Sequence, residues 1–192
     1  MGGVTPVDWP AQCAGFDDNG LALILIAPPA GTARSAARLL ARQVLRETLS
    51  QLLAQPAATL MLNECPHGPV LEGAAHNIQI SVSYAADRCL LGLGKGCRLG
   101  VDIVRIEALP ETTALARLYL PATACHEIMT AAPAARAACF ALRWAQMEAR
   151  SKCLGLPLAE ISRQREQTLN ECRLMDCVQT EGYRIALATR VL

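Results

Sequence analysis

The segment RWAQMEARSKCLG at residues 143–155 places an acid and a base on one face of a predicted helix. Trp144, Glu148 and Lys152 are spaced four residues apart, so on a helix they follow one another along one stripe, one turn apart. Taken alone, a Glu–Lys pair at this spacing is explained by an ion pair that merely stabilises the helix. Asp102 favours a chemical role, because it interrupts the apolar stretch LGVDIVRI. An unpaired carboxylate in such a strand is costly, so it needs a cation, a metal or solvent.

A strand aspartate and a helix glutamate brought together would form a site with two hard oxygen ligands. Such a pair is typical of Mg²⁺ sites whose remaining ligands are water and phosphate. Lys152, one turn beyond Glu148, could then reach a phosphate of the same substrate. A row of four arginines is either the solvated face of an amphipathic helix or a grip for a further phosphate: Arg34, Arg38, Arg42 and Arg46. The predicted chemistry is phosphoryl transfer at a magnesium-bound pyrophosphate.

Apolar patterns and turn residues predict the elements that position these side chains. Pro133 suits the first turn of a helix and Gly155 its end, which predicts a long helix from Pro133 to Leu154. The glycine-rich stretch GLGKGCRLG lacks the spacing of a P-loop and is interpreted as a tight turn between strands. Strands are predicted at 21–27, at 77–93 as a pair joined by the AAD turn, and at 99–106, 172–179 and 182–190, with helices at 33–54 and 121–129.

This order of elements predicts an α+β fold made of two pseudo-duplicated halves. Each half would hold a helix and antiparallel strands, with residues 1–98 forming the first half and residues 99–192 the second. The second half would then supply the surface that a single unit would need from a partner, so we expect a monomer.

The composition excludes several classes of protein. A hydrophobic content of 52% and a charged content of 18% exclude global disorder. The net charge of +1 gives no electrostatic basis for binding nucleic acid or a membrane surface. No segment approaches the ~20 apolar residues of a membrane span, and the start resembles neither a signal peptide nor a myristoylation site. We therefore expect a cytoplasmic protein.

The nine cysteines form no CxxC pair. Their odd number, without a secretion signal, favours reduced thiols used as small apolar residues. A zinc site remains an alternative, although its spacings match no common ligand pattern; it would combine Cys65, His67, His76 and the pair Cys125–His126.

Two motifs together resemble a known family. GVDI at 100–103 and WAQMEARSK at 144–152 resemble the signature motifs of the 4′-phosphopantetheinyl transferase superfamily, of the Sfp-like, two-half type. Asp102 and Glu148 are 46 positions apart, which suits the family pattern. Weaker similarities lie in the arginine-bearing segment ARQVLRETLSQLL, in HGPVLEG near the family's GKP motif, and in ISVSYA near its S-H-S motif. The resemblance spans about residues 33–190.

The resemblance implies an enzyme that transfers 4′-phosphopantetheine from coenzyme A to a serine of an apo carrier protein of the acyl, polyketide or peptidyl type. Asp102 and Glu148 would bind Mg²⁺, and Lys152 would stabilise the phosphate. Glu148 would take the serine proton, directly or through a water on the metal. The products would be the holo carrier protein and adenosine 3′,5′-bisphosphate. The residues implied to bind coenzyme A are Arg42, Arg46, Ser83, Tyr84 and Lys152.

The sequence also departs from the family pattern. Met147 and Gly68 stand where the family usually has lysines, and Tyr84 stands in place of a histidine. Val104 occupies a position where some members carry a third acid. These changes leave open an alternative, a degenerate relative that binds carrier protein or coenzyme A without catalysis. A structural protein with an incidental Glu–Lys pair is a third interpretation, but it leaves Asp102 unexplained.

Overall fold

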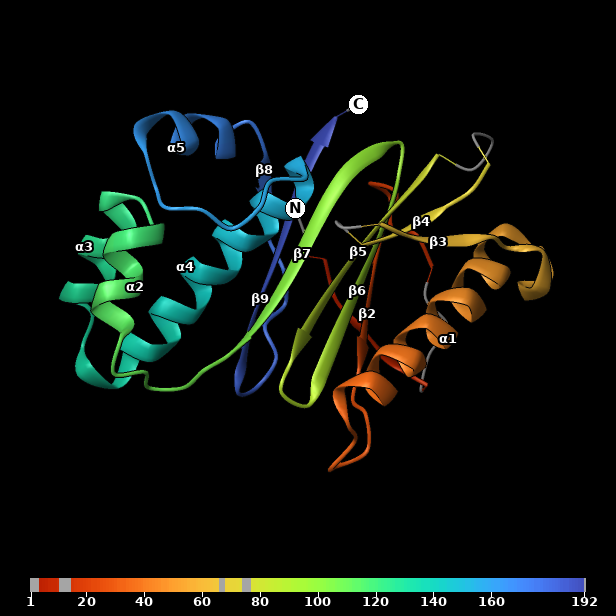
Figure 1. Cartoon of the computed structure of the whole chain (residues 1–192), viewed down its shortest axis with the longest axis horizontal. Coiled ribbons are helices and arrows are strands. Elements are labelled where there is room, and N and C mark those ends of the chain that lie inside the picture. Colours follow the sequence, from red (N-terminus) through yellow and green to blue (C-terminus); the bar gives the residue numbers. More distant parts are fainter. Residues whose placement is uncertain (1–3, 11–14, 66–67, 74–76, 192) are drawn as a thin grey trace.

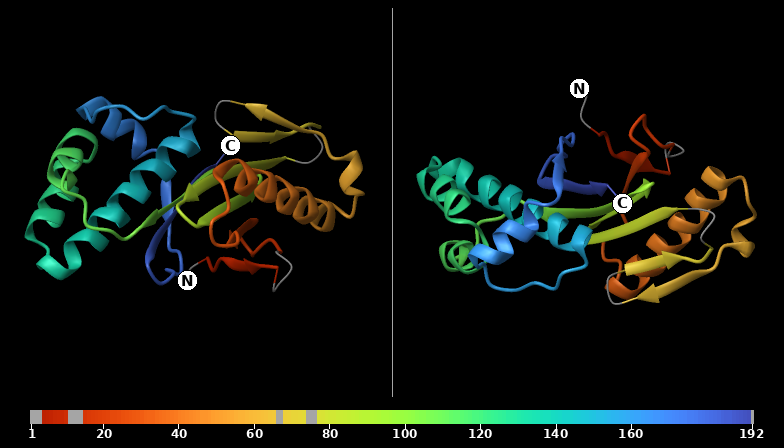
Figure 2. Two further views of the ribbon diagram at one scale, coloured as in Figure 1. Left: turned by 60° about the horizontal axis from the view of Figure 1, so that its bottom comes forward. Right: turned by 90° about the horizontal axis from the view of Figure 1, so that it is seen from above.

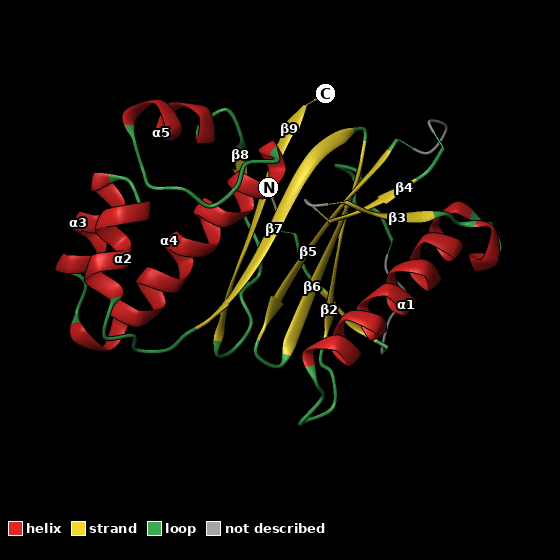
Figure 3. Cartoon of the chain, viewed as in Figure 1, coloured by secondary structure: helices red, strands yellow, loops and turns green. Residues whose placement is uncertain are grey.

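The computed structural model describes residues 4–10, 15–65, 68–73 and 77–191 (Figure 1). It is a mixed α+β structure whose strands lie between helices at its two ends (Figure 3). The strands are β1 (Val7–Trp9), β2 (Leu21–Ile26), β3 (Leu62–Cys65), β4 (Gly68–Leu71), β5 (Ile78–Ala85), β6 (Arg88–Lys95), β7 (Cys97–Arg105), β8 (Arg173–Met175) and β9 (Tyr183–Val191). The helices are α1 (Arg34–Leu53), the short 3₁₀ helix η1 (Ala57–Thr59), α2 (Thr112–Tyr119), α3 (Ala122–Thr130), α4 (Pro133–Leu154) and α5 (Arg163–Leu169).

The first sheet has the strand order β1-β2-β6-β5, and only the short β1–β2 pairing in it is parallel. Every residue of β2 is buried, which is why its sequence LALILI is apolar throughout. Its even-numbered side chains pack with α1, and its odd-numbered side chains face the second sheet. β2 is therefore a central strand with a core on each face.

The second sheet has the order β7-β9-β8, and α4 covers one of its faces. The contact is close because β7 carries Gly100 where the helix crosses it. A Cβ atom at this position would lie 2.0 Å from the carbonyl oxygen of Ala149 and 2.4 Å from the amide nitrogen of Cys153. Small residues of α4 and β9 continue this contact: Ala145, Ala149, Ala186 and Ala188. The sequence thus lets the helix lie almost directly on the strand that carries Asp102.

The layers follow the order α1, first sheet, second sheet, α4, with α2 and α3 beyond α4 (Figures 1 and 2). The apolar cluster between the sheets joins leucines of β2 and β6 to side chains of β7 and β9. The two sheets therefore share one core.

Most predicted elements are present. The long helix begins at Pro133 and ends at Leu154 as predicted, with Gly155 in the left-handed conformation that closes it. The AAD turn joins β5 and β6, and the GKGCR turn leads into β7. Other elements were missed or were shorter than expected. Helices α2 and α5 and strands β1, β3 and β4 were not predicted, and the strand expected at 172–179 is the three-residue β8.

The mixed α+β class and the antiparallel sheets are confirmed. The duplication of one unit stays a prediction, and so does the boundary between residues 98 and 99, which falls inside β7. Among the helices of the described residues, none combines the length and apolar character needed to cross a membrane.

Candidate functional site

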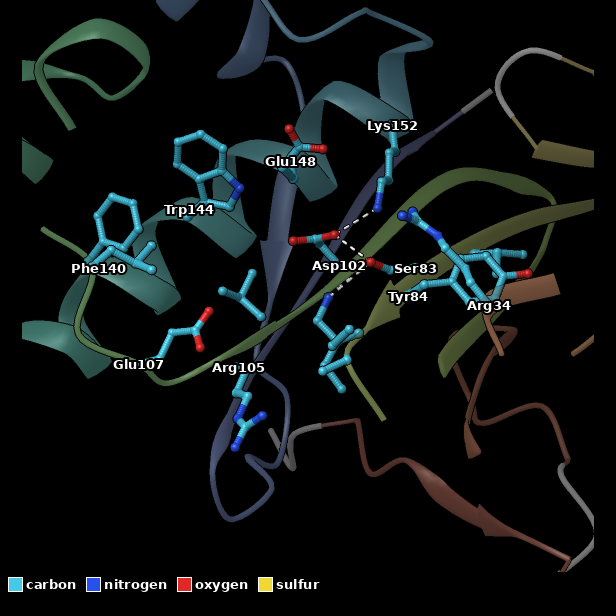
Figure 4. Close-up of a pocket in the computed structure, with 16 residues that line it drawn as sticks. Arg34, Ser83, Tyr84, Asp102, Arg105, Glu107, Phe140, Trp144, Glu148 and Lys152 are labelled. Atoms are coloured by element: carbon cyan, nitrogen blue, oxygen red, sulfur yellow. Dashed lines mark hydrogen bonds and ion pairs between the residues drawn. The ribbon is translucent and has the colours of Figure 1, made fainter. Parts of the chain in front are cut away.

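Strands β5 and β7 and helix α4 together border a cavity of about 470 Å³. Asp102 of β7 and both Glu148 and Lys152 of α4 line it, as the sequence predicted (Figure 4). Arg34 at the start of α1 and Tyr84 at the end of β5 also line it. The size is typical of small-molecule sites.

Asp102 is buried, with 5% of its surface exposed, yet its carboxylate is paired. Its Oδ1 atom accepts a hydrogen bond from Ser83 Oγ at 2.6 Å and an ion-paired hydrogen bond from Lys152 Nζ at 2.7 Å. Lys152 Nζ also donates to the carbonyl oxygen of Val101 at 3.2 Å. Burial raises the pKa of Asp102, while Lys152 opposes that rise. The other carboxylate oxygen points away from Ser83 and Lys152, towards the Trp144 side of the cavity (Figure 4).

Glu148 has different surroundings. Within the described residues its carboxylate has no hydrogen-bond or ion-pair partner. Burial raises the pKa of Glu148, and the charge of Asp102 raises it further, whereas Lys152 and Arg165 lower it. A carboxyl group in a cavity whose pKa is raised by burial and by a second acid is typical of a functional site.

This pair of acids fits a divalent cation. Asp102 and Glu148 offer oxygen ligands of the type that Mg²⁺ prefers. A bound cation would favour the ionised form of both carboxyl groups, whose pKa values are raised by burial and, for Glu148, also by the charge of Asp102. The described residues contain no group of three or more His, Cys, Asp or Glu side chains able to hold a metal ion. A metal on this pair would therefore keep positions for water and substrate, as Mg²⁺ sites usually do.

One further group of the cavity, Arg34, can contact a phosphate. Arg34 is exposed, and its guanidinium extends towards the pair formed by Asp102 and Lys152 (Figure 4). Tyr84 packs on the α1 side of β5, where the Arg38 guanidinium lies 5.9 Å from the centre of its ring. Its hydroxyl is buried without a hydrogen-bond partner and points away from Asp102 (Figure 4). Sequence reasoning grouped Arg34 with the arginine row but did not select it. The signal that could have found it is its place at the first turn of the helix, beside the end of a neighbouring strand.

The two arginines that were selected from this row do not line the cavity. Arg42 forms an ion pair with Glu64, and its Nη1 atom is buried without a hydrogen-bond partner. Arg46 lies on the exposed face of α1 and forms no ion pair within the described part of the chain. The helical spacing placed the arginines on one side of α1. Only the start of that side, at Arg34, borders the cavity, and Arg42 and Arg46 lie further along the helix.

The packing of α4 decides the places of Trp144 and Met147. The Trp144 ring contacts Tyr119 of α2 and Phe140 of α4, with 5.6 Å between ring centres in each pair. It therefore forms a wall of the cavity within the second half. Met147 is buried against α2 and α3 rather than in the cavity. A lysine at this position would point away from Asp102, since neighbouring helical residues face directions about 100° apart.

A second cavity lies on the other side of Lys152, and residues of β4, β5 and β7 also line it. Gly68 borders this cavity with open space around it. Its φ of +119° lies in the region that favours glycine, so this backbone conformation does not suit a lysine, and residue 68 supplies no cation on this side. His67 and His76, two of the residues imagined as zinc ligands, lie outside the described residues.

Comparison with known proteins agrees with the motifs. Residues 98–187 match the family model described as the 4′-phosphopantetheinyl transferase superfamily. A search of curated proteins found no match to the chain. The matched segment begins in β7, ends in β9, and includes the whole of α4 with its two signature side chains. Residues 98–187, a little under half of the chain, are therefore similar to the 4′-phosphopantetheinyl transferase superfamily.

Proposed function

We propose that this protein transfers the 4′-phosphopantetheine group of coenzyme A to a serine of an apo carrier protein. The observation that carries the proposal is the single cavity in which Asp102, Glu148 and Lys152 meet, in a segment that matches a transferase superfamily. The products would be the holo carrier protein and adenosine 3′,5′-bisphosphate.

The carboxylates of Asp102 and Glu148 would hold Mg²⁺ in this site. When bound, the ion would neutralise negative charge on the pyrophosphate of coenzyme A. Asp102 is already held on one side by Ser83 and Lys152, so a single oxygen remains available to the metal. Glu148 has no competing partner among the described residues, which leaves both of its oxygens available.

Lys152 would hold the phosphate that moves to the carrier protein. Its side chain is 28% exposed, so it can turn from Asp102 towards a substrate oxygen without leaving the cavity. Arg34 would contact a further phosphate oxygen. Arg42 and Arg46 remain candidates only for parts of coenzyme A that extend beyond the cavity.

Glu148 would act as the general base. Its raised pKa makes it a better proton acceptor than an exposed carboxylate. It takes the proton of the carrier serine while the serine oxygen bonds to the β-phosphorus. The bond between that phosphorus and the bridging oxygen breaks, and the electron pair leaves with adenosine 3′,5′-bisphosphate.

The test is the intact mass of apo carrier proteins after incubation with this protein, coenzyme A and Mg²⁺. We expect an acyl or a peptidyl carrier to gain one phosphopantetheine, and we expect no gain with the Glu148→Ala variant. Coenzyme A labelled in the pantetheine arm would identify the group that is transferred.

A second candidate function is binding of coenzyme A or a carrier protein without transfer. Two observations favour it: Gly68 offers no cation beside the second cavity, and Tyr84 provides a hydroxyl where an imidazole is usual. Binding of coenzyme A in calorimetry without a mass change on any carrier would support this candidate and contradict the first.

A further inference from the structure

One edge of β7 lacks a partner strand in the described structure. β9 pairs with the other edge along its whole length. Facing the free edge, β5 presents two buried serines instead of backbone groups. Ser81 Oγ accepts a hydrogen bond from the amide of Val101 at 3.0 Å, and Ser83 Oγ accepts one from the amide of Ile103 at 3.3 Å. These hydroxyls satisfy donors that would otherwise be buried without partners.

Ser83 makes one contact that Ser81 does not. Its hydroxyl lies 2.6 Å from Asp102 Oδ1. The amide of Ile103 can only donate to Oγ, and an ionised carboxylate can only accept. The hydroxyl hydrogen of Ser83 must therefore point at Asp102. Two hydrogen bonds therefore fix the orientation of the Ser83 hydroxyl, one accepted from the Ile103 amide and one donated to the Asp102 carboxylate.

We infer that Ser83 is a positioning residue for Asp102 and not a ligand of coenzyme A. This inference rests on the proposed metal site. Ser83 is 5% exposed and its only hydrogen is directed at Oδ1, so no donor is left for a substrate phosphate. By binding Oδ1 together with Lys152, it turns the other carboxylate oxygen of Asp102 towards the α4 side of the cavity (Figure 4).

The role becomes important when Lys152 turns to a phosphate. Asp102 then keeps one of its two side-chain partners, and that partner is Ser83. A carboxylate without it could rotate about its last torsion, which is soft in aspartate. Residues that orient a metal ligand in this way commonly change metal affinity by about 10- to 100-fold.

The test measures direct Mn²⁺ binding, with Mn²⁺ as a spectroscopic substitute for Mg²⁺, by electron paramagnetic resonance without coenzyme A or carrier protein. We expect Ser83→Ala to weaken Mn²⁺ binding about tenfold or more. Ser83→Thr retains the hydroxyl and should recover most of the affinity. Ser81→Ala is the matched control, because it removes the same kind of backbone contact from the same strand but leaves Asp102 untouched. It should bind Mn²⁺ within about twofold of the wild type, with a loss of melting temperature similar to that of Ser83→Ala.

The outcomes separate the two levels of the proposal. Wild-type affinity in Ser83→Ala, or equal losses in both alanine variants, would overturn the role of Ser83 and leave the metal site intact. Failure of the wild-type protein itself to bind Mn²⁺ would overturn the metal site and this role together.

Discussion

Asp102 and Glu148 are both acids in the same cavity, but their environments differ. Asp102 is paired with Lys152 and Ser83, which oppose the rise in its pKa that burial causes. Glu148 has no hydrogen-bond or ion-pair partner within the described residues, and burial together with the charge of Asp102 raises its pKa. A group left in an unfavourable state is typical of sites in which stability is lost for function. Glu148 is thus the residue that most needs a cation.

Replacing Glu148 by glutamine should stabilise the metal-free protein by about 1 kcal/mol, because it removes the uncompensated charge. The same change should lower the transfer rate at least about 100-fold, since glutamine cannot accept the serine proton.

Asp102→Asn should instead destabilise the metal-free protein by about 2 kcal/mol, because it leaves Lys152 without its anionic partner. Urea unfolding in the presence of EDTA measures both free energies. Destabilisation of equal size in the two variants would contradict the difference between the acids.

The raised pKa of Glu148 predicts how stability depends on pH. A folded-state pKa above the ordinary carboxyl value of 4.5 means that the folded protein holds this proton more tightly than the unfolded chain does. Stability without metal should therefore fall as pH rises from about 4.5 through the folded-state pKa. Glu148→Gln should show a smaller fall, with the remainder contributed by Asp102, whose pKa is also raised.

Unfolding free energies between pH 4 and pH 8, with EDTA or with excess Mg²⁺, would check this prediction. Mg²⁺ should reduce the fall in the wild type, because the cation favours the ionised carboxylates. Profiles of the same slope in the wild type and in Glu148→Gln would show that Glu148 does not titrate abnormally.

At the scale of elements, local signals were sufficient for α4 but not for α2 or α5. α4 carries a proline in its first turn and a glycine after its end, and its 22 residues hold a long stripe of side chains. α5 has seven mostly polar residues, of which Leu169 is the buried one. Its signal was Ser162, whose hydroxyl caps the helix by accepting a hydrogen bond from the amide of Arg165. Short helices of this kind depend on tertiary contacts that a sequence pattern does not contain.

Residue types alone were enough to predict the acids and the lysine of the candidate site. They were not enough to predict which arginine lies near it. An acid in an apolar strand needs a cation or a metal beside it, and a helix stripe with an acid and a lysine can supply one or share the other. Asp102, Glu148 and Lys152 were therefore predicted as one group. The choice among the four arginines of α1 depended on where the helix begins relative to β5. Helical periodicity gives the face of a helix but not the position along it that reaches a cavity. Only the three-dimensional structure distinguishes Arg34 from Arg46.

The crossing of α4 over β7 at Gly100 sets the position of two of the three central side chains. Gly100→Ala places a methyl group where the helix backbone lies, so α4 must shift. We expect a stability loss of about 3 kcal/mol and a transfer rate reduced about 100-fold, since a shift of about 1 Å is enough for such an effect. Gly15→Ala is the control, because nothing lies within 4 Å of the added atom. Thermal unfolding and carrier mass measurements check the pair, and a fully active Gly100→Ala protein would show that the helix position is not critical.

At the scale of the whole molecule, several contacts join the predicted halves. The apolar cluster between the sheets draws on β2, β6, β7 and β9. The backbone near Val4 pairs with the segment after β8, through hydrogen bonds to Asp176 and from Val178. The turn between β5 and β6 contacts β9, where Tyr183 donates to Asp87. Since the acids lie beside this junction, the geometry of the site depends on both sheets together.

These shared contacts predict that the protein unfolds as one cooperative unit and not as two domains. The chain has two tryptophans, Trp9 beside the core of the first sheet and Trp144 on α4. Single-tryptophan variants, with phenylalanine at the other position, therefore report the two halves separately in urea. Their transitions should coincide. Leu23→Ala, at a residue 1% exposed between the sheets, should lower the stability seen by both probes by about 3 kcal/mol, while Leu39→Ala, at a residue 72% exposed on α1, should change neither. Two separated transitions, with Leu23→Ala affecting only Trp9, would instead support independent domains divided near residue 98.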